Sequence, residues 1–416
     1  MNKTLFYCFT LILFVLFTGC DDDPILPVDN CPNPPCSDDP PPNKIGDLDT
    51  LWSVPISESY TGTEHIKVIN GIVYFSVGAN LIAYDAASGE EIWNWSDPVF
   101  DSRALSFEIC ELDGLVILQN GSRMVSVDLI TGKTLKFYNQ NIPNFGAMAR
   151  GALLGDYYYY TRLKDGRSAA KLVRSHKDDL QNWEPIYSLI NGEDTGGSWP
   201  FIESYNLWVN PTSGDSVLVF QHRMAVPNRV DVVAISLNTR ETLWRHNDIN
   251  VSGNSNHQQM LVMNDKAYIM AAEVVIAYDM FTGDVVWKHF DPGLVIAYMF
   301  HNFAYAESID ALIVKGATSR LYALDPETGA EKLFVPDGSS NSVGSGSPLY
   351  HNGIIYYNTI GHLHAIKAST GVFLWKERSY MKHNSGFNGD IGIDEDNGLL
   401  FAADGYYLYA IKMYED

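Results

Sequence analysis

The sequence predicts an all-β fold built from repeated four-stranded units. Two observations predict it. One short motif recurs six times between residues 81 and 375, and most neighbouring copies stand 42 to 46 residues apart. A fixed period of this size indicates a repeat architecture in which each unit is one supersecondary element. The length of 416 residues alone would have suggested two or three separate domains.

Each copy of the motif reads as strand, turn and strand. Apolar residues alternate along 81–84, a turn of the type Asp-x-x-Thr-Gly follows, and the next strand carries a Trp. Gly at the end of the turn supplies the positive φ that a tight turn between antiparallel strands requires. The six turns end at Gly89, Gly132, Arg240, Gly283, Gly329 and Gly371. A second strand pair precedes each copy, as in 349–350 and 354–357, so each unit has four antiparallel strands.

The spacing predicts eight such units. The interval from Gly132 to Arg240 is long enough for two, one of them irregular around residues 157–189. After Gly371 the sequence supplies inner strands at 399–403 and 407–411 but no outer strand with a Trp. Residues 51–54 match 92–95 and would provide that strand. Because four-stranded units arranged around an axis form a β-propeller, we expect an eight-bladed β-propeller closed by the N-terminal strand.

Five Trp residues hold a constant place in the repeat, which predicts packing between blades rather than a cofactor site. They are Trp52, Trp93, Trp244, Trp287 and Trp375. Cys110 lies within a strand-like apolar run, so a buried and unreactive thiol is expected there.

The N-terminal sequence predicts a targeting signal followed by a tether. Residues 1–19 have an early Lys and a short apolar run, as in a signal peptide, and end in a lipobox-like Thr-Gly before Cys20. Acylation of Cys20 would anchor the protein to a membrane without spanning it. Residues 20–47 are rich in Pro and Asp and predict an extended tether, in which Cys31 and Cys36 could form a disulfide. The propeller would then occupy residues 48–416.

The acidic run directly after Cys20 bears on localisation. Asp21-Asp22-Asp23 resembles the export tag of surface-displayed lipoproteins in Bacteroidetes-type bacteria, whereas in enteric bacteria an Asp there would favour inner-membrane retention. We expect a lipid-anchored envelope protein of the outer membrane, facing the periplasm or the cell surface. The net charge of −22, of which −17 falls outside residues 1–47, makes nucleic acid an unfavourable partner.

The motif Ala-x-Asp-x-x-Thr-Gly-x-x-x-Trp, with Ser347-Pro348 ahead of a first strand, resembles the pyrroloquinoline-quinone (PQQ) type propeller repeat. Two families share this repeat: quinoprotein alcohol dehydrogenases and BamB, the scaffold lipoproteins of the outer-membrane β-barrel assembly machinery. The resemblance to the dehydrogenases implies a quinone held against two adjacent Cys, but no two of the five Cys are adjacent and no haem motif is present. The length, the lipobox and the lack of a large extra domain favour the BamB resemblance, so no cofactor and no catalytic residue are expected.

The segments before the innermost strands should converge around the central channel on one face, which we call the funnel face. Their polar residues are the candidate ligand-binding set: His65, Arg103, Arg150, His257, His301, Asn388 and Asp390. His65, His257 and His301 would bind a metal only if the ring brought them together, and we expect none. The acidic segment 394–398 lacks calcium-loop spacing and predicts a solvated turn.

The sequence therefore predicts a non-enzymatic envelope lipoprotein whose propeller is a scaffold for protein partners, with outer-membrane protein assembly as the implied process. The alternative is a cell-surface propeller that binds or processes a small molecule or carbohydrate in the funnel.

Overall fold

The computed structural model describes residues 48–56, 65–97, 106–120, 123–139, 145–148, 151–164, 169–190, 200–225, 228–250, 260–271, 274–290, 303–316, 320–336, 346–359, 361–378, 386–387 and 389–414. All of them belong to one compact unit, 43–416. The expected signal peptide and tether, with Cys20, Cys31 and Cys36, lie outside the described residues.

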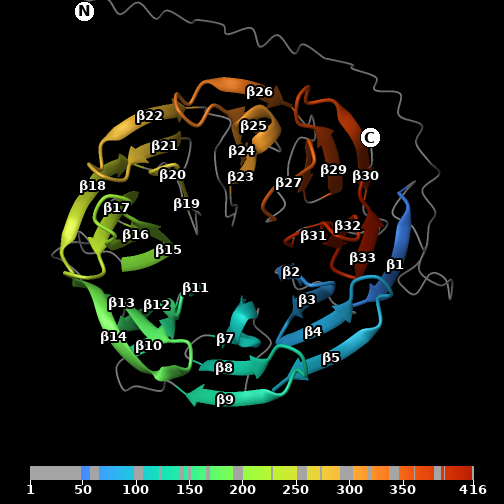
Figure 1. Cartoon of the computed structure of the whole chain (residues 1–416), viewed down its shortest axis with the longest axis horizontal. Helices are drawn as coiled ribbons and strands as arrows, with labels where there is room; N and C mark the ends of the chain where they lie inside the picture. Colours follow the sequence, from blue (N-terminus) through green and yellow to red (C-terminus); the bar gives the residue numbers. More distant parts are fainter. Residues whose placement is uncertain are drawn as a thin grey trace, which may run out of the picture. The chain divides into compact units, whose positions relative to one another are not determined.

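The described strands form eight antiparallel sheets arranged as the blades of a ring (Figure 1). The prediction of an eight-bladed β-propeller is confirmed. The first four blades are β2–β5, β6–β9, β10–β14 and β15–β18; the last four are β19–β22, β23–β26, β27–β30, and β31–β33 together with β1.

Blades 1 to 4 contain the following elements. Blade 1 has β2 (His65–Ile69), β3 (Ile72–Val77), β4 (Asn80–Asp85) and β5 (Glu91–Ser96); blade 2 has β6 (Ser106–Cys110), the 3₁₀ turn η1 (Glu111–Asp113), β7 (Leu115–Asn120), β8 (Arg123–Asp128) and β9 (Thr134–Asn139). Blade 3 has β10 (Phe145–Met148), β11 (Ala152–Leu154), β12 (Tyr157–Lys164), β13 (Ala169–His176) and β14 (Asp179–Ile190); blade 4 has β15 (Pro200–Val209), β16 (Ser216–Ala225), β17 (Asn228–Ser236) and β18 (Thr242–Asn250).

Blades 5 to 8 follow the same plan. Blade 5 has β19 (Met260–Met263), β20 (Lys266–Ala271), β21 (Val274–Asp279) and β22 (Val285–Phe290); blade 6 has β23 (Ala304–Ala306), η4 (Glu307–Ile309), β24 (Ala311–Lys315), β25 (Leu321–Leu324) and β26 (Glu331–Val335). Blade 7 has β27 (Leu349–His351), β28 (Ile354–Asn358), β29 (His362–Lys367) and β30 (Phe373–Arg378); blade 8 has β31 (Gly392–Asp394), β32 (Leu399–Ala403), β33 (Tyr407–Lys412) and β1 (Thr50–Pro55).

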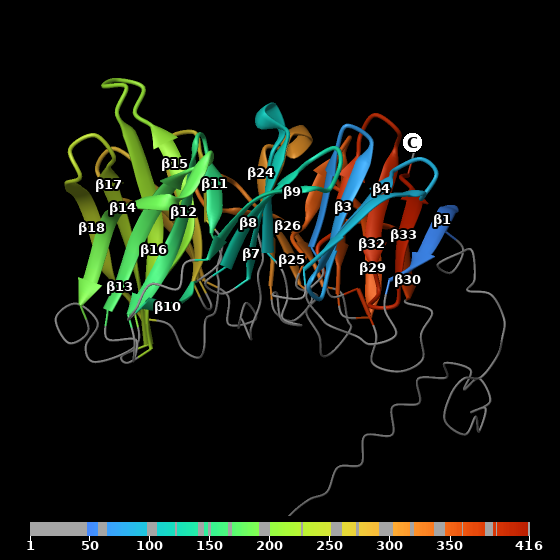
Figure 2. The ribbon, with the colours of Figure 1, turned by 90° about the horizontal axis from the view of Figure 1, so that it is seen from below.

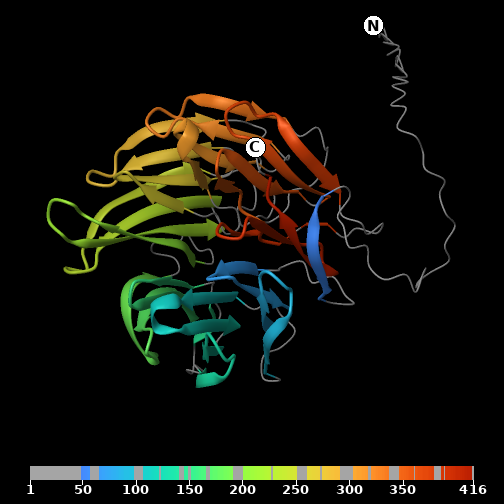
Figure 3. The same ribbon diagram turned by 45° about the vertical axis from the view of Figure 1, so that its right-hand side comes forward.

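The ring is closed by β1. It pairs antiparallel with β33, with Trp52 opposite Ala410 and Val54 opposite Leu408. Figures 1 and 3 both show the blue strand β1 beside the red strands from the other end of the chain. The predicted closure by the N-terminal strand is thus confirmed, and it leaves the last blade with a full set of four strands.

Blades 3 and 4 depart from the regular pattern; the long interval in the repeat predicted one irregular unit, around residues 157–189 of blade 3, and did not predict blade 4. Two inner strands, β10 and β11, both pair with β12, so blade 3 has five strands rather than four. The strands of blade 4 are 9 or 10 residues long, whereas most strands of blades 1, 5 and 7 have 6 residues or fewer. These two blades therefore carry hairpins longer than those of their neighbours (Figure 2).

A Trp and a Gly lock neighbouring blades together. The indole Nε1 of Trp52, Trp93, Trp244 and Trp287 donates to the backbone oxygen of Ala86, Leu129, Met280 and Pro326 respectively, at 2.9 to 3.2 Å. In all four cases the acceptor residue directly follows the Asp that begins the turn of the next blade. The indole ring packs closely against the turn Gly. A Cβ on Gly283 would stand 2.6 Å from Trp244 Cγ. The predicted packing of these Trp residues between blades is confirmed.

The core consists of apolar clusters between successive blades. One joins blades 4 and 5 around Trp244, and another joins blades 8 and 1 around Phe401.

Cys110 is buried, as predicted, and its Sγ donates to Asp113 Oδ2 at 2.7 Å. The part of the chain that the structure describes contains no candidate membrane-spanning helix.

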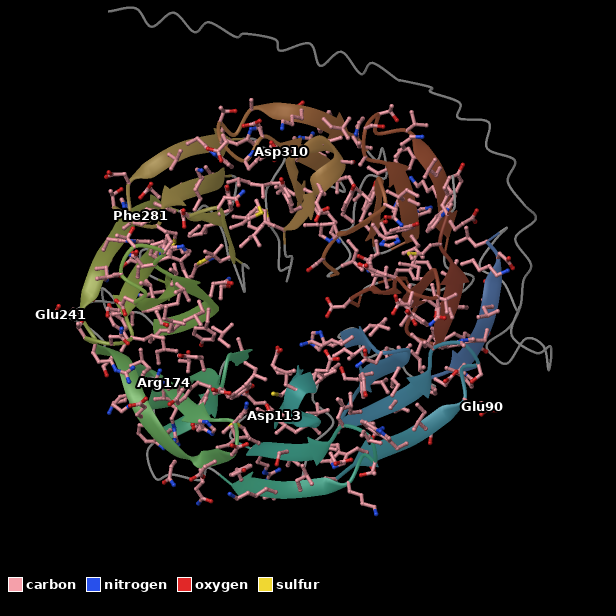
Figure 4. All side chains as sticks on the ribbon, in the orientation of Figure 1. Glu90, Asp113, Arg174, Glu241, Phe281 and Asp310 are labelled. Atoms are coloured by element: carbon pink, nitrogen blue, oxygen red, sulfur yellow. The ribbon has the colours of Figure 1, made fainter. Side chains whose placement is uncertain are left out.

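The ring has two unlike faces. The turns between third and fourth strands lie on one face, which we call the turn face; the hairpins between second and third strands lie on the funnel face. Figure 4 places Glu90 and Glu241, both in turns of the turn face, at the outside of the ring, and Asp113 and Asp310 nearer its axis.

Candidate functional site

Two of the seven predicted funnel residues are described, and they lie together. His65 is the first residue of β2 in blade 1, and Asp390 precedes β31 in blade 8. Their side chains meet through His65 Nδ1 and Asp390 Oδ2 at 2.8 Å. The other five, Arg103, Arg150, His257, His301 and Asn388, lie outside the described residues, so the ligand-binding role of the set stays a prediction.

The His65–Asp390 pair is partly open to solvent. The two side chains are 16% and 27% exposed. Because an ionised carboxylate only accepts hydrogen bonds, Nδ1 of His65 carries the proton of this bond. The backbone N–H of His65 is held in turn by Ser76 Oγ at 3.2 Å. The pair therefore fixes the start of β2 against the start of β31 on the funnel face.

Four buried polar side chains brace the same face, and the sequence reasoning missed them. Each is the fifth residue of its blade's second strand: Gln119, Thr161, Lys315 and Asn358. We call them the brace residues. Each bonds to backbone of the following blade, at or just before its innermost strand. Gln119 Oε1 accepts from Gly151 N at 3.1 Å, Thr161 donates to Ile202 O at 2.7 Å, Lys315 donates to Gly346 O at 2.5 Å, and Asn358 donates to Gly389 O at 2.7 Å.

One brace residue, Asn358, positions a predicted funnel residue. Gly389, which accepts from Asn358, directly precedes Asp390, so Asn358 holds the backbone on which the partner of His65 stands. A buried polar group must find a hydrogen-bond partner, and here that need ties one blade to the next. A sequence signal was present: a polar residue interrupts an otherwise apolar strand at the same repeat position in several blades.

Lys315 is a fully buried charged group of this face. Its three N–H donors match three acceptors: Gly346 O at 2.5 Å, Asn358 O at 2.9 Å and Asn358 Oδ1 at 3.1 Å. Burial penalises the ammonium form and lowers the pKa of Lys315 to about 7, while the negative charge of Asp390 opposes this shift.

A second buried charge cluster occupies the lengthened strands of blade 4. Arg245 donates from Nη2 and Nε to Asp231 Oδ2 at 2.7 and 3.2 Å, and the Asp231 side chain is fully buried. His222 Nδ1 lies 3.7 Å from the same oxygen. A buried carboxylate persists only where a cation or donors compensate it, so Arg245 explains why Asp231 is tolerated in an apolar strand.

The part of the chain that the structure describes does not bring metal ligands together. Among the described residues, no three His, Cys, Asp or Glu side chains gather as metal ligands. Asp394 begins the predicted solvated turn, and its carboxylate accepts from the side chain and backbone N–H of Asn397 at 2.9 and 3.3 Å. His65 with Asp390, Arg245 with Asp231, and Lys315 with backbone oxygens are each compensated in this way, which suits a rigid surface.

Comparison with known proteins gives one family match. Residues 228–415, a little under half of the chain, match a family model described as outer membrane protein assembly factor BamB. This stretch runs from β17 to the end of blade 8. A search of curated proteins found no sequence match.

Solved structures share the fold at low identity. BamB from Moraxella catarrhalis is 12% identical, with a TM-score of 0.59, over 88% of this chain and 99% of that one. A quinohemoprotein alcohol dehydrogenase from Comamonas testosteroni is 13% identical, with a TM-score of 0.62, over 89% of this chain and 78% of that one. The computationally designed Ika8 protein is 12% identical, with a TM-score of 0.62, over 88% and 100%. The chain is a PQQ-like β-propeller that resembles BamB, and the variety of these neighbours limits what the fold says about activity.

Proposed function

We propose that this chain is a non-enzymatic envelope lipoprotein that serves as a scaffold for protein–protein interaction in outer-membrane protein assembly. The observation that carries the proposal is the match of residues 228–415 to the BamB family model, within a closed ring of eight blades. A ring without free ends presents its loops from fixed positions, which suits a surface that docks partners.

The interior contacts support a rigid scaffold. The Trp–Gly locks fix the turn face, and the brace residues fix the funnel face. Because both sets join one blade to the next, motion of a single blade would cost several contacts at once. Such a body keeps the relative positions of its loops when a partner binds.

The quinone of the related dehydrogenases does not fit the residues present. The resemblance would require two adjacent Cys, and Cys110 stands without a neighbouring Cys in the sequence. Its thiol is directed to Asp113 beside η1, between blades 2 and 3. We therefore derive no redox step for this chain.

Membrane attachment through Cys20 is part of the proposal. Replacing Cys20 by Ser removes the thiol that would be acylated, so the variant should leave the membrane fraction and appear in the soluble envelope extract. A Cys110→Ser variant is the matched control, since its thiol is buried inside the propeller, and it should stay with the membranes. A Cys20→Ser chain that sediments with membranes like the parent would contradict the lipid anchor.

Recovery of partners tests the scaffold role. The tagged chain is crosslinked in intact cells, purified and identified by mass spectrometry, in parallel with the Cys20→Ser variant. We expect components of the β-barrel assembly machinery with both chains, because contacts made by the propeller do not need the lipid. Failure to recover any such component with the anchored chain would contradict the proposal, and loss from the Cys20→Ser sample alone would indicate shared location rather than binding.

A funnel ligand is the second candidate function. The juxtaposition of His65 and Asp390, two of the predicted funnel residues, favours it because a His–carboxylate pair open to solvent can exchange hydrogen bonds with a polar ligand. Glycan-array binding of the purified chain, compared with Arg150→Ala and His257→Ala, tests it. Binding that is absent, or unchanged in both variants, would contradict a funnel site.

A further inference from the structure

The regular contact between blades shows what each outer-strand Trp binds. Trp93 Nε1 and Tyr74 Oη both donate to Leu129 O, at 3.2 and 3.4 Å. Trp287 Nε1 and Tyr268 Oη likewise both donate to Pro326 O, at 2.9 and 3.2 Å. In each case the acceptor belongs to a turn of the next blade whose Gly lies against the indole. In blades 1 and 5 the site is thus a Trp–Tyr pair that binds one backbone oxygen and one Gly of a turn.

Blade 7 has the same pair without that turn. Tyr356, Ala365 and Trp375 stand opposite one another across the blade, as Tyr74, Ala83 and Trp93 do in blade 1. The rings of Tyr356 and Trp375 lie 6.1 Å apart, close to the 5.9 Å between Tyr74 and Trp93.

The next blade explains the difference. In blade 8 the third strand, β33, and the fourth, β1, come from opposite ends of the described chain, so no Asp-x-x-Thr-Gly turn joins them. Met413 occupies the place of the usual acceptor residue, because its N–H donates to Gly398 O at 2.8 Å just as the N–H of Ala86 donates to Gly71 O at 2.9 Å.

Beyond Met413 the chain departs from the turn path. The N–H of Tyr414 donates to Tyr356 Oη at 3.2 Å, so this hydroxyl accepts where its counterparts donate. Within the described residues, the indole Nε1 of Trp375 makes no hydrogen bond. Trp375 is only half-buried, whereas Trp93, Trp244 and Trp287 are 7% to 8% exposed.

A pocket of about 690 Å³ stands where the turn would lie. Its walls include Trp375 from blade 7, Gly398 and Met413 from blade 8, Leu51 from the closing strand and Ala87 from blade 1. Its volume falls within the roughly 300 to 1,000 Å³ typical of ligand pockets. Of the Trp sites at 52, 93, 244, 287 and 375, the one at Trp375 is left open by the turns that the structure describes.

We propose that this closure pocket binds a Gly-containing β-turn of another polypeptide. The turn's backbone oxygen would accept from Trp375 Nε1, and its Gly would lie against the indole, as the chain's own turns do at Trp52, Trp93, Trp244 and Trp287. A side chain at the Gly position is excluded by the same geometry, since a Cβ on Gly329 would stand 2.5 Å from Trp287. The proposal names a docking surface for the scaffold role and so rests on that proposed function.

The probe is a cyclic peptide with the sequence of residues 323–332, ALDPETGAEK, which forms such a turn in blade 6. Fluorescence polarisation measures its binding to the full mature chain. We expect saturable binding, at least tenfold weaker for the peptide with Gly329→Val. Trp375→Phe keeps the ring and removes the indole donor, which should weaken binding about fivefold. Ile130→Ser, an exposed change in the turn of blade 2, is the matched control and should leave binding unchanged.

Other occupants give different results, and each would overturn the proposal. If the peptide binds only after removal of residues 21–43, the pocket belongs to the chain's own tether. If sedimentation shows a dimer that Trp375→Phe dissociates, it belongs to a second copy. Equal binding of both peptides, or none, would show that the pocket does not select a Gly turn. Failure here together with recovery of assembly components after crosslinking would remove this docking surface and leave the scaffold role in place.

Discussion

His65 and Asp390 are separated by 325 positions in the sequence, yet His65 Nδ1 and Asp390 Oδ2 lie 2.8 Å apart. The pair joins the first strand of blade 1 to the first strand of blade 8 near the axis. At the periphery, β1 joins the same end of the chain to β33. The ring is therefore closed both near its axis and at its periphery. A force that pulls on the N-terminal segment would be resisted by a side-chain pair as well as by backbone hydrogen bonds.

A double-mutant cycle measures the inner closure. His65→Ala and Asp390→Asn should each destabilise the chain in urea unfolding, with a coupling of about 1 kcal/mol because the bond is charged and half-buried. The matched control is His176 with Asp178, an exposed pair 3.4 Å apart, whose coupling should be indistinguishable from zero. Equal coupling in the two cycles would show that the closure pair contributes nothing specific to the ring.

The Trp–Gly lock is tested by comparing two glycines with similar backbones. Gly353 has φ +82° and open space around it, so Gly353→Ala should cost about 1 to 2 kcal/mol through the backbone alone. Gly283 has φ +77° but lies against Trp244, so Gly283→Ala should cost about 1 to 3 kcal/mol more. The free energy of unfolding gives both values. Equal losses would mean that the indole moves aside without cost.

Lys315 predicts a pH dependence of stability. Its pKa is lowered to about 7 in the folded chain, against about 10.4 when unfolded. Between these values the unfolded chain binds one more proton than the folded chain, so this residue makes stability rise with pH from about 7 to 10. Lys315→Met removes that contribution.

The measurement for Lys315 is urea unfolding of both chains from pH 6 to 10. The difference between wild type and Lys315→Met should shift in favour of the wild type as the pH rises, which separates Lys315 from groups common to both. A constant difference would show that the three carbonyl-type acceptors keep Lys315 protonated throughout.

The thiol of Cys110 should be unreactive toward alkylating reagents while the chain is folded. Burial raises the pKa of its thiol, and the hydrogen bond to Asp113 raises it further, so little thiolate forms near neutral pH. Iodoacetamide labelling followed by mass spectrometry should modify the peptide containing Cys110 only after unfolding in urea. Rapid labelling of the native chain at pH 8 would contradict this burial.

Repetition made much of the fold predictable from sequence. The spacing of Gly89, Gly283 and Gly371 fixed the period, and the match between residues 51–54 and 92–95 located the closing strand. These features are local patterns repeated along the chain, so each copy supports the interpretation of the others.

The functional surfaces were less predictable because they depend on contacts between blades. Nothing in the local sequence pairs His65 with Asp390, and Lys315 became informative only once its acceptors at Asn358 and Gly346 were located. The closure pocket at Trp375 could not be deduced from the motif either. Trp375 occupies the usual Trp position of the repeat, and the pocket arises because the neighbouring blade 8 lacks the usual turn.

Outer-membrane protein assembly itself tests the account most directly. The measurement is the folded fraction of outer-membrane β-barrel proteins, read from heat-modifiable gel mobility, in cells with and without this chain. We predict a lower folded fraction without the chain and its restoration by the wild-type chain. An unchanged folded fraction in cells lacking the chain would contradict a role as an assembly scaffold.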